Sequence, residues 1–237
     1  GGTFAEPVVG LMMRDEWLEE LVALPAEHAP TFIEIYPENY AARGPRLRSH
    51  VAQLAERFPL TAHTVQLSLG GEWRPPEETL RSLRDFLDAH DIEWIGDHVA
   101  VSFDGAPGSV GENLHELLPI PFNAESARIV AENARAARVA IGRELMIENT
   151  CAYFQPPGSS WSEGALMREI VEQSDATLLL DVNNLWVNAQ NLGGDVHQIL
   201  EELPLARVRE LHVGGFTVDG PSGLLIDSHA AAPSNPV

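Results

Sequence analysis

The sequence predicts an α/β barrel of the (β/α)8 TIM type, and three observations indicate this fold. Short apolar runs alternate with segments of helical periodicity. Runs such as LLLD at residues 178–181 are apolar at successive positions, which is typical of parallel strands buried on both faces. Several runs end in histidine or a carboxylate, as strands do at the active edge of barrel enzymes. Because such barrels reach about 250 residues, we expect a single domain over residues 1–237.

The first half of the chain contains four predicted strands and three predicted helices. The strands are expected at residues 7–13, 31–36, 60–65 and 92–101. The helices are expected at residues 15–24, 45–58 and 75–89, where apolar residues recur every three to four positions. Residues 104–121 are rich in glycine and proline, so we expect a long loop there, of the kind that covers an active site.

The second half continues the alternation. A helix over residues 123–141 is predicted from the N-cap residue Asn123 and the terminating Gly142. Strands are expected at residues 144–148, 177–180, 208–213 and 224–227, with helices at 162–174 and 195–203. A doubly wound open sheet is the rival fold, but the first strand is not followed by its glycine-rich phosphate turn. After His229 only AAAPSNPV follows, so the final helix of the barrel is expected to be missing.

Composition excludes several kinds of partner. The chain has 35 acidic and 15 basic residues and a net charge of −20, which disfavours binding to nucleic acid. Cys151 is the lone cysteine, so an internal disulfide is excluded and a reducing compartment is favoured. No apolar run approaches the 18 residues or so that a membrane helix needs. We therefore expect a soluble, cytoplasmic protein without a membrane partner.

The residues at the strand ends predict a metal site. Carboxylates that follow strongly apolar runs would otherwise be buried charges without partners. Histidines and carboxylates without a thiolate pair suit Fe(II), Mn(II) or Zn(II), and seven ligands exceed what one ion uses, so two ions sharing a carboxylate are expected. The alternative is a barrel without metal in which these are ordinary polar residues. The candidate ligands are His63, His98, Glu148, Asp181, His212, Asp227 and His229.

The sequence around these residues resembles a known enzyme family. The matching stretches are EIYPENY (34–40), HTVQLSLG (63–70), DH (97–98), LHELLPIPF (114–122), ENTCAYF (148–154), LLLDVNN (178–184), ELHVGG (210–215) and LLIDSH (224–229). They resemble the multinuclear non-haem iron-dependent oxidative enzymes, formerly a family of unknown function, which include the iron oxidase of methanobactin biosynthesis. The resemblance implies a TIM-type barrel that binds two or three irons and uses O2 to modify a cysteine or another residue of a ribosomally made peptide. It also implies a small partner protein that presents the leader peptide.

Carried over by position, the resemblance assigns ligands to the irons. His63, His98 and Glu148 would hold one iron, and Asp181, His212 and Asp227 would hold its neighbour. Two histidines that the family uses for a third metal are replaced here by Leu192 and Phe216. We therefore expect a two-iron centre, with His229 as the remnant of the third site. Substrate contacts or hydrogen bonds that orient the ligands are expected from Glu34, Asn39, Asn149, Asn183 and Asn184.

Two other functions remain open from the sequence. A divalent-metal sugar isomerase or epimerase of the xylose-isomerase-like type uses similar barrels and ligands. It normally needs a lysine or paired acids near the metals, and this chain is poor in lysine. A barrel that has lost metal binding and serves as a non-catalytic binding module is the second alternative.

Cys151 is interpreted as a small apolar residue rather than a redox group.

Overall fold

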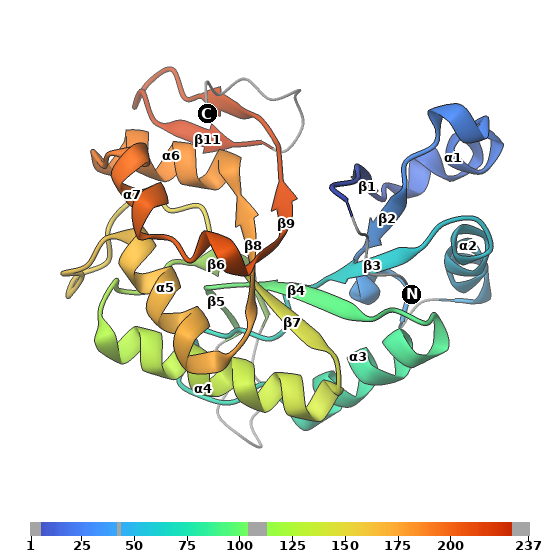
Figure 1. Ribbon diagram of the computed structural model, residues 1–237, viewed down its shortest axis with the longest axis horizontal. Coiled ribbons are helices and arrows are strands. Elements are labelled where there is room, and N and C mark those ends of the chain that lie inside the picture. The colour runs from blue at the N-terminus through green and yellow to red at the C-terminus, as the bar shows by residue number, and fades with distance from the viewer. Residues whose placement is uncertain (1–5, 42–43, 104–112, 229–237) are drawn as a thin grey trace.

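A curved parallel sheet forms the centre of the computed structural model, which describes residues 6–41, 44–103 and 113–228. Seven strands are hydrogen-bonded in the order β1-β2-β3-β4-β7-β8-β9, and every pairing among them is parallel. The sheet curls, and helices cover its outer side (Figure 1). The predicted α/β fold of the TIM-barrel type is thus confirmed. The strands are β1 (Gly10–Met12), β2 (Phe32–Ile35), β3 (Leu60–His63), β4 (Trp94–His98), β7 (Glu144–Glu148), β8 (Thr177–Asp181) and β9 (Val208–His212).

The helices follow the strands with the caps that the sequence provides. In α4 the side chain of Asn123 accepts a hydrogen bond from the Ser126 N–H at 2.9 Å, and the helix ends at Gly142 with φ of 70°. Ser162 caps α5 in the same way. The helices are α1 (Leu18–Ala23), α2 (Pro45–Ala55), α3 (Glu77–Ala89), α4 (Ala124–Ile141), α5 (Glu163–Ser174), α6 (Val182–Leu192) and α7 (Val196–Glu202). Short 3-10 turns cover Asp15–Trp17, Ala26–His28, Pro37–Asn39 and Leu205–Arg207.

The core lies between the sheet and this layer of helices. Strand residues such as Ile33, Ala62, Ile95 and Leu145 are fully buried, and they pack against apolar faces of the helices, including Leu87 of α3. Burial on both faces explains why the strands read as apolar at consecutive positions. No helix within the described ranges is long and apolar enough to cross a membrane.

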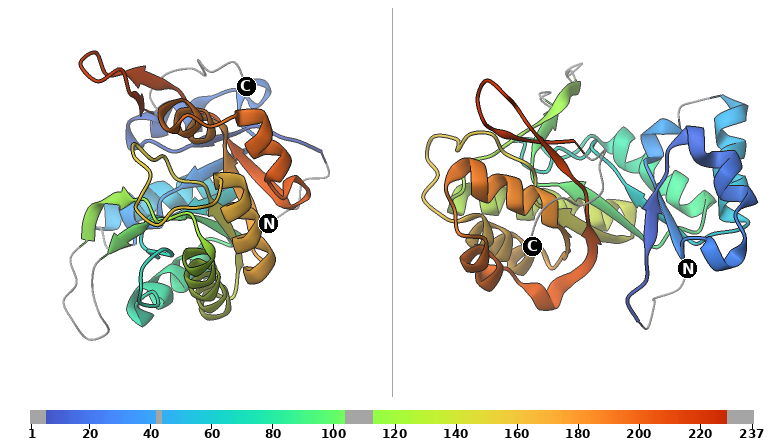
Figure 2. Two further views of the ribbon diagram at one scale, coloured as in Figure 1. Left: turned by 90° about the vertical axis from the view of Figure 1, so that its left-hand side faces the viewer. Right: turned by 90° about the horizontal axis from the view of Figure 1, so that it is seen from above.

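The predicted eighth strand forms but does not join the parallel sheet. β11 (Leu225–Asp227) pairs antiparallel with β10 (Phe216–Val218), and in the described residues neither strand is hydrogen-bonded to β9 or β1. The turn between them is built by Asp219, whose carboxylate accepts the Ser222 N–H at 3.0 Å, and by Gly223 with φ of 73°. A tight turn gives β11 an antiparallel partner close in sequence. Figures 1 and 2 show this hairpin beside α6.

Two further regions differ from the sequence prediction. α6 starts directly after β8, in a stretch for which no helix was predicted, because Asp181 caps the helix by accepting the Asn184 N–H at 2.7 Å. The long loop predicted at residues 104–121 lies partly outside the described residues. Its second part forms β6 (Asn113–Leu118), which pairs antiparallel with β5 (Val101–Phe103).

Candidate metal centre

Five of the predicted ligands are each the last residue of a different strand. Parallel strands end at one edge of the sheet, so these side chains converge although they lie far apart in the sequence. Four of them are at least nine-tenths buried, and His212 is partly buried. The five are His63 of β3, His98 of β4, Glu148 of β7, Asp181 of β8 and His212 of β9.

The first donor group contains His63, His98 and Glu148. Oε2 of Glu148 lies 3.0 Å from Nε2 of His63 and 3.0 Å from Nε2 of His98. The two imidazole rings stand edge to face, with their centroids 4.7 Å apart. One donor atom from each residue lies within 4.8 Å of the other two, so the group is compact enough to surround one ion.

The second donor group shares Glu148 with the first. The other carboxylate oxygen of Glu148, Oε1, lies 3.1 Å from Nδ1 of His212. Asp181 completes this group, again with all three donor atoms within 4.8 Å of one another. Glu148 therefore points one oxygen at each group, which is the arrangement of a carboxylate that bridges two ions.

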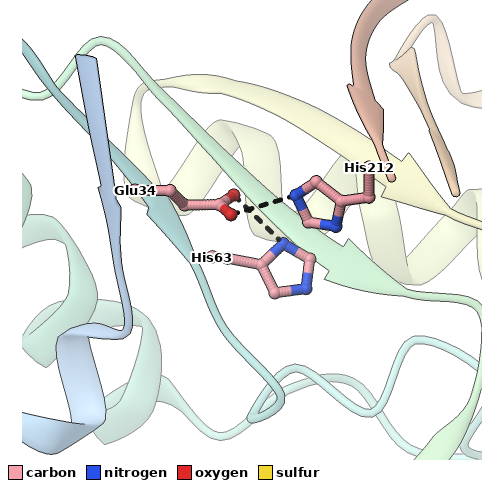
Figure 3. Close-up of side chains that lie close together, drawn as sticks. All are labelled: Glu34, His63 and His212. Carbon is pink, nitrogen blue, oxygen red and sulfur yellow. Dashed lines mark ion pairs between the residues drawn. The ribbon is translucent and has the colours of Figure 1, made fainter. Parts of the chain in front are cut away.

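Glu34 of β2 lies against two of the same histidines (Figure 3). Its Oε2 is 3.0 Å from Nε2 of His212, and its Oε1 is 3.7 Å from Nδ1 of His63. These three residues are also within the 4.8 Å limit of a metal-binding group. Glu34 is 3% exposed, so its charge is nearly removed from water and depends on these neighbours.

The charges at this edge offset one another. Burial would raise the pKa of Glu148, but His98, His63 and His212 hold it well below its ordinary value. Burial likewise opposes the charge of His212, yet Glu34 and Glu148 raise the pKa of this histidine to about 12. The pKa of His98 is also raised, against burial, chiefly by Glu148. The carboxylates thus require positive charge beside them, and divalent cations supply it when they displace the protons from the histidines.

The donor set fits divalent transition-metal ions. Two ligand atoms at right angles around an ion with bonds of about 2.1 Å lie roughly 3.0 Å apart, which agrees with the contacts of Glu148. Within the described residues, Oε2 of Glu148 is buried and makes no hydrogen bond. A buried carboxylate oxygen without a hydrogen bond is costly unless a cation occupies its lone pairs. Histidine and carboxylate ligands without thiolate suit Fe(II), Mn(II) and Zn(II).

Two asparagines fix the position of Asp181. The Asn149 side chain accepts the Asp181 N–H at 2.9 Å and donates to the Asp181 carbonyl at 3.1 Å. Asn184 donates to the carbonyl of Asn149 at 3.1 Å. Both asparagines are buried, so the backbone at the end of β8 is held rigidly against that of β7.

The remaining predicted residues lie elsewhere or are not described. Asp227, at the end of β11, accepts a hydrogen bond from Asn183 at 2.8 Å and belongs to none of the three donor groups. Asn39 is exposed, and its backbone N–H closes a turn onto Tyr36. His229 lies outside the described residues. The second donor group thus contains Glu148 where the resemblance placed Asp227, and the roles of Asp227 and His229 stay predictions.

Two buried acids, Glu34 and Glu163, make more contacts at or beside the centre than the sequence predicts. Glu34 was predicted only as a substrate or orienting residue, although a carboxylate between Ile33 and Ile35 inside an apolar strand already indicates a buried charge with a partner. Glu163, at the start of α5, is not among the site residues predicted from the sequence. Its two oxygens accept hydrogen bonds from Asn149 and Asn188, each at 3.1 Å. Burial raises the pKa of Glu163 to about 7.

A cavity of about 540 Å³ lies away from this centre. Its lining residues are at the N-terminal ends of β4 and β7 and the end of α4. Its two arginines are engaged, since Arg138 pairs with Asp175 and Arg143 with Asp88. The cavity therefore offers little to an anionic ligand, and the convergence of histidines and carboxylates identifies the candidate site instead.

Comparisons with known proteins identify the family of this chain. The family model described as "RiPP precursor modification enzyme MbnB/TglH/ChrH" matches residues 8–237. A UPF0276 protein of Pseudomonas aeruginosa is 37% identical over 228 residues, which cover 96% of this chain and 77% of the relative. A UPF0276 protein of Acinetobacter baylyi is 34% identical and covers 97% of this chain and 76% of the relative.

Solved structures with a similar fold are mainly sugar epimerases. A D-psicose 3-epimerase superposes with a TM-score of 0.58 at 15% identity, covering 91% of this chain and 76% of the epimerase. A xylose isomerase-like TIM barrel protein of Mycobacterium smegmatis, in complex with magnesium, superposes with a TM-score of 0.51 at 12% identity, covering 93% of this chain and 79% of that protein. At such low identity these likenesses establish the barrel fold alone.

Proposed function

We propose, on the premise that this chain belongs to the MbnB/TglH/ChrH family of RiPP precursor modification enzymes, that it is a di-iron oxidative enzyme. RiPPs are ribosomally synthesised and post-translationally modified peptides, so the family acts on peptide precursors. The proposed reaction is the O2-dependent oxidation of a cysteine or another residue of such a peptide. The observation that supports two ions most strongly is Glu148, which points one oxygen at each of two donor groups.

The chain's residues have separate roles in this proposal. His63, His98 and Glu148 hold one ion, while Glu148, Asp181 and His212 hold the other. Bound iron supplies a site for the substrate thiolate and for electron transfer to O2, which protein side chains cannot provide. Asn149 fixes the backbone of Asp181. The burial of His63, Glu148 and Asp181 keeps bulk water from the inner side of the centre, so the peptide must approach from the strand ends.

The proposed centre lacks a complete third site. Leu192 is the last residue of α6 and Phe216 is the first residue of β10, and neither side chain has an atom that binds a metal. Both occupy positions at which the family's third metal would take histidine. We propose that two irons per chain suffice for this protein.

The peptide substrate and its delivery are also part of the proposal. A precursor peptide follows from the family, and a small protein that presents its leader is the proposed partner. The net charge of −20 favours a partner or leader with basic residues.

A sugar isomerase or epimerase is the alternative enzyme. Its support is the barrel fold alone. All 15 basic residues of this chain are arginine, so proton transfer in such an enzyme would depend on paired acids near the metals rather than on a lysine. A binding module without metal is the alternative outside enzymes, and in it protonated His98 and His212 would have to balance the buried carboxylates of the centre.

Anaerobic metal loading separates the three functions. The protein is titrated with Fe(II), Mn(II) or Zn(II), and the iron-loaded sample is studied by Mössbauer spectroscopy before and after brief exposure to O2. Two bound irons and a mixed-valent di-iron spectrum are expected. Stronger retention of Mn(II) or Zn(II) than of iron would favour the isomerase, and failure to take up any of the three metals would favour the binding module.

A further inference from the structure

The imidazoles of His63 and His212 each lie between two carboxylates. Nε2 of His63 faces Glu148 at 3.0 Å, and Nδ1 of the same ring faces Glu34 at 3.7 Å. In His212 the nitrogens are exchanged, so that Nδ1 faces Glu148 at 3.1 Å and Nε2 faces Glu34 at 3.0 Å. Figure 3 shows the carboxylate of Glu34 pointing at both rings.

These two rings serve different ions in the proposed function, on which this inference rests. His63 belongs to the donor group of His98, whereas His212 belongs to that of Asp181. The nitrogen facing Glu148 is the metal ligand in each ring. A metal-bound histidine carries a proton on its other nitrogen, and that N–H is normally donated to a carboxylate or a carbonyl. In both rings the other nitrogen faces Glu34.

We infer that Glu34 is a positioning residue that accepts the second N–H of both His63 and His212 and so fixes the ring orientation of one ligand at each ion. One carboxylate can do this because it has two oxygens, and here Oε1 is nearer to His63 and Oε2 to His212. Within the described residues, Nδ1 of His63 and Nε2 of His212 are buried and have no hydrogen-bond partner, and Glu34 is the carboxylate that faces each of them. The contact with His212 is already at hydrogen-bond distance, whereas the 3.7 Å contact with His63 would have to shorten when the metal binds.

A third ion among Glu34, His63 and His212 is the competing assignment. It would require both rings to bind metal through both nitrogens while the first two ions are present. Each imidazole would then lose its remaining proton and become an anion, which is unusual for histidine ligands. In His98 the nitrogen that does not face Glu148, Nδ1, likewise has a carboxylate near it, since Oδ1 of Asp97 lies 3.7 Å away, although Nε2 of His63 is also within 3.4 Å of this nitrogen.

The tautomers of the two histidines test this inference directly. The wild-type protein is loaded with Zn(II), a diamagnetic substitute, and its histidine nitrogens are assigned by long-range ¹H–¹⁵N NMR. We expect His63 to carry its proton on Nδ1 and His212 on Nε2, and both N–H signals to shift in the Glu34→Gln variant. A metal-bound Nδ1 of His63 or Nε2 of His212 would overturn the inference in favour of a third ion.

Iron affinity provides the second test, in the full chain. Because Glu34→Gln removes the charged acceptor from both rings, it is expected to lower the affinity for both ions by about 10- to 100-fold. Glu38→Gln is the matched control, since Glu38 lies in the following turn and accepts the Val65 N–H at 3.1 Å without contacting the histidines. The control is expected to bind both irons as the wild type does.

The possible results distinguish this inference from the proposed function. A wild-type protein that takes up neither iron nor zinc overturns both. Unchanged iron affinity in Glu34→Gln, a loss confined to one ion, or an equal loss in Glu38→Gln overturns the role of Glu34 and leaves the di-iron proposal standing. Circular dichroism of each variant confirms that it is folded.

Discussion

Two groups of buried polar residues meet at the C-terminal edge of the sheet, and they differ in how their hydrogen bonds are satisfied. In the acid-amide cluster, defined here as Asn149, Glu163 and Asn188, both oxygens of Glu163 accept amide N–H groups and Asn188 also accepts the Ala152 N–H at 2.6 Å. In the metal centre, Oε2 of Glu148 and other buried atoms of the described residues make no hydrogen bond.

This difference distinguishes buried polar residues that stabilise the fold from buried polar residues that can bind a metal. A satisfied buried network rigidifies the fold, whereas buried carboxylate oxygens without hydrogen bonds need positive charge beside them, from protonated histidines or from a bound cation. The two groups touch, because Asn149 binds Glu163 on one side and the backbone of Asp181 on the other. Substitutions in the two groups should therefore affect different properties: folding stability in the acid-amide cluster and iron binding in the candidate metal centre.

Loss of Glu148 should have the largest effect. Because its two oxygens serve both donor groups, Glu148→Ala is expected to lower the affinity for both irons by more than about 100-fold, leaving less than one tightly held iron per chain. Iron content after anaerobic loading and desalting measures this. Glu144→Ala, at the other end of the same strand, is the control and should retain two irons. Two irons retained in Glu148→Ala would contradict the bridge.

Loss of a ligand that belongs to only one donor group should remove one ion. His98→Ala is expected to lose the first iron, and Asp181→Asn the second, since asparagine preserves the cap of α6 but not the anionic ligand. Iron content should fall from two to about one per chain in each variant, with different Mössbauer parameters for the ion that remains. The same ion lost in both variants would refute the division into two groups.

The acid-amide cluster should affect the pH dependence of stability. The pKa of Glu163 is raised to about 7 by burial, above the ordinary value of 4.5. The unfolded chain therefore loses this proton first, and the contribution of Glu163 to stability is present below pH 4.5 and lost as the pH rises to about 7. This loss amounts to roughly 3 kcal/mol.

Urea unfolding of the wild type and Glu163→Gln measures this effect. Glutamine does not ionise, so the difference in unfolding free energy between the two proteins should shift in favour of the variant between pH 4.5 and 7.5. A difference that is the same at both pH values would show that Glu163 is ionised in the folded protein.

Asn188→Ala should have the smallest effect, a loss of folding stability without a loss of iron. It leaves the Ala152 N–H and one oxygen of Glu163 without partners, which should cost about 1–3 kcal/mol of unfolding free energy. Iron content should stay at two per chain, because Asn188 contacts none of the donor residues. Loss of an iron without loss of stability in Asn188→Ala would remove the distinction between the two groups.

Much of the barrel was predictable because its signals are local. Apolar runs, the caps Asn123 and Ser162 and the stop at Gly142 each act within a few residues. The convergence of His63, His98, Glu148, Asp181 and His212 was predictable as well, because strand ends in a parallel sheet meet by topology. The pairing of β11 was not, since an apolar run does not specify its partner and the Asp219–Gly223 turn was overlooked.

The environment of the acids could not be predicted in the same way. Whether Glu34 supports one histidine or two depends on side-chain directions across three strands, which the sequence pattern does not contain. Glu163 occupies an ordinary first-turn position of a helix, where an acid is expected on electrostatic grounds. Only its burial against Asn149 and Asn188 reveals another role.

The positions of the bound ions show directly whether Glu148 bridges two metals. Crystals of the anaerobically iron-loaded protein give these positions from anomalous difference maps at the iron absorption edge. Two peaks are expected, one between Glu148, His63 and His98 and the other between Glu148, Asp181 and His212. The absence of iron beside Glu148, or a peak enclosed by Glu34, His63 and His212, would contradict this expectation.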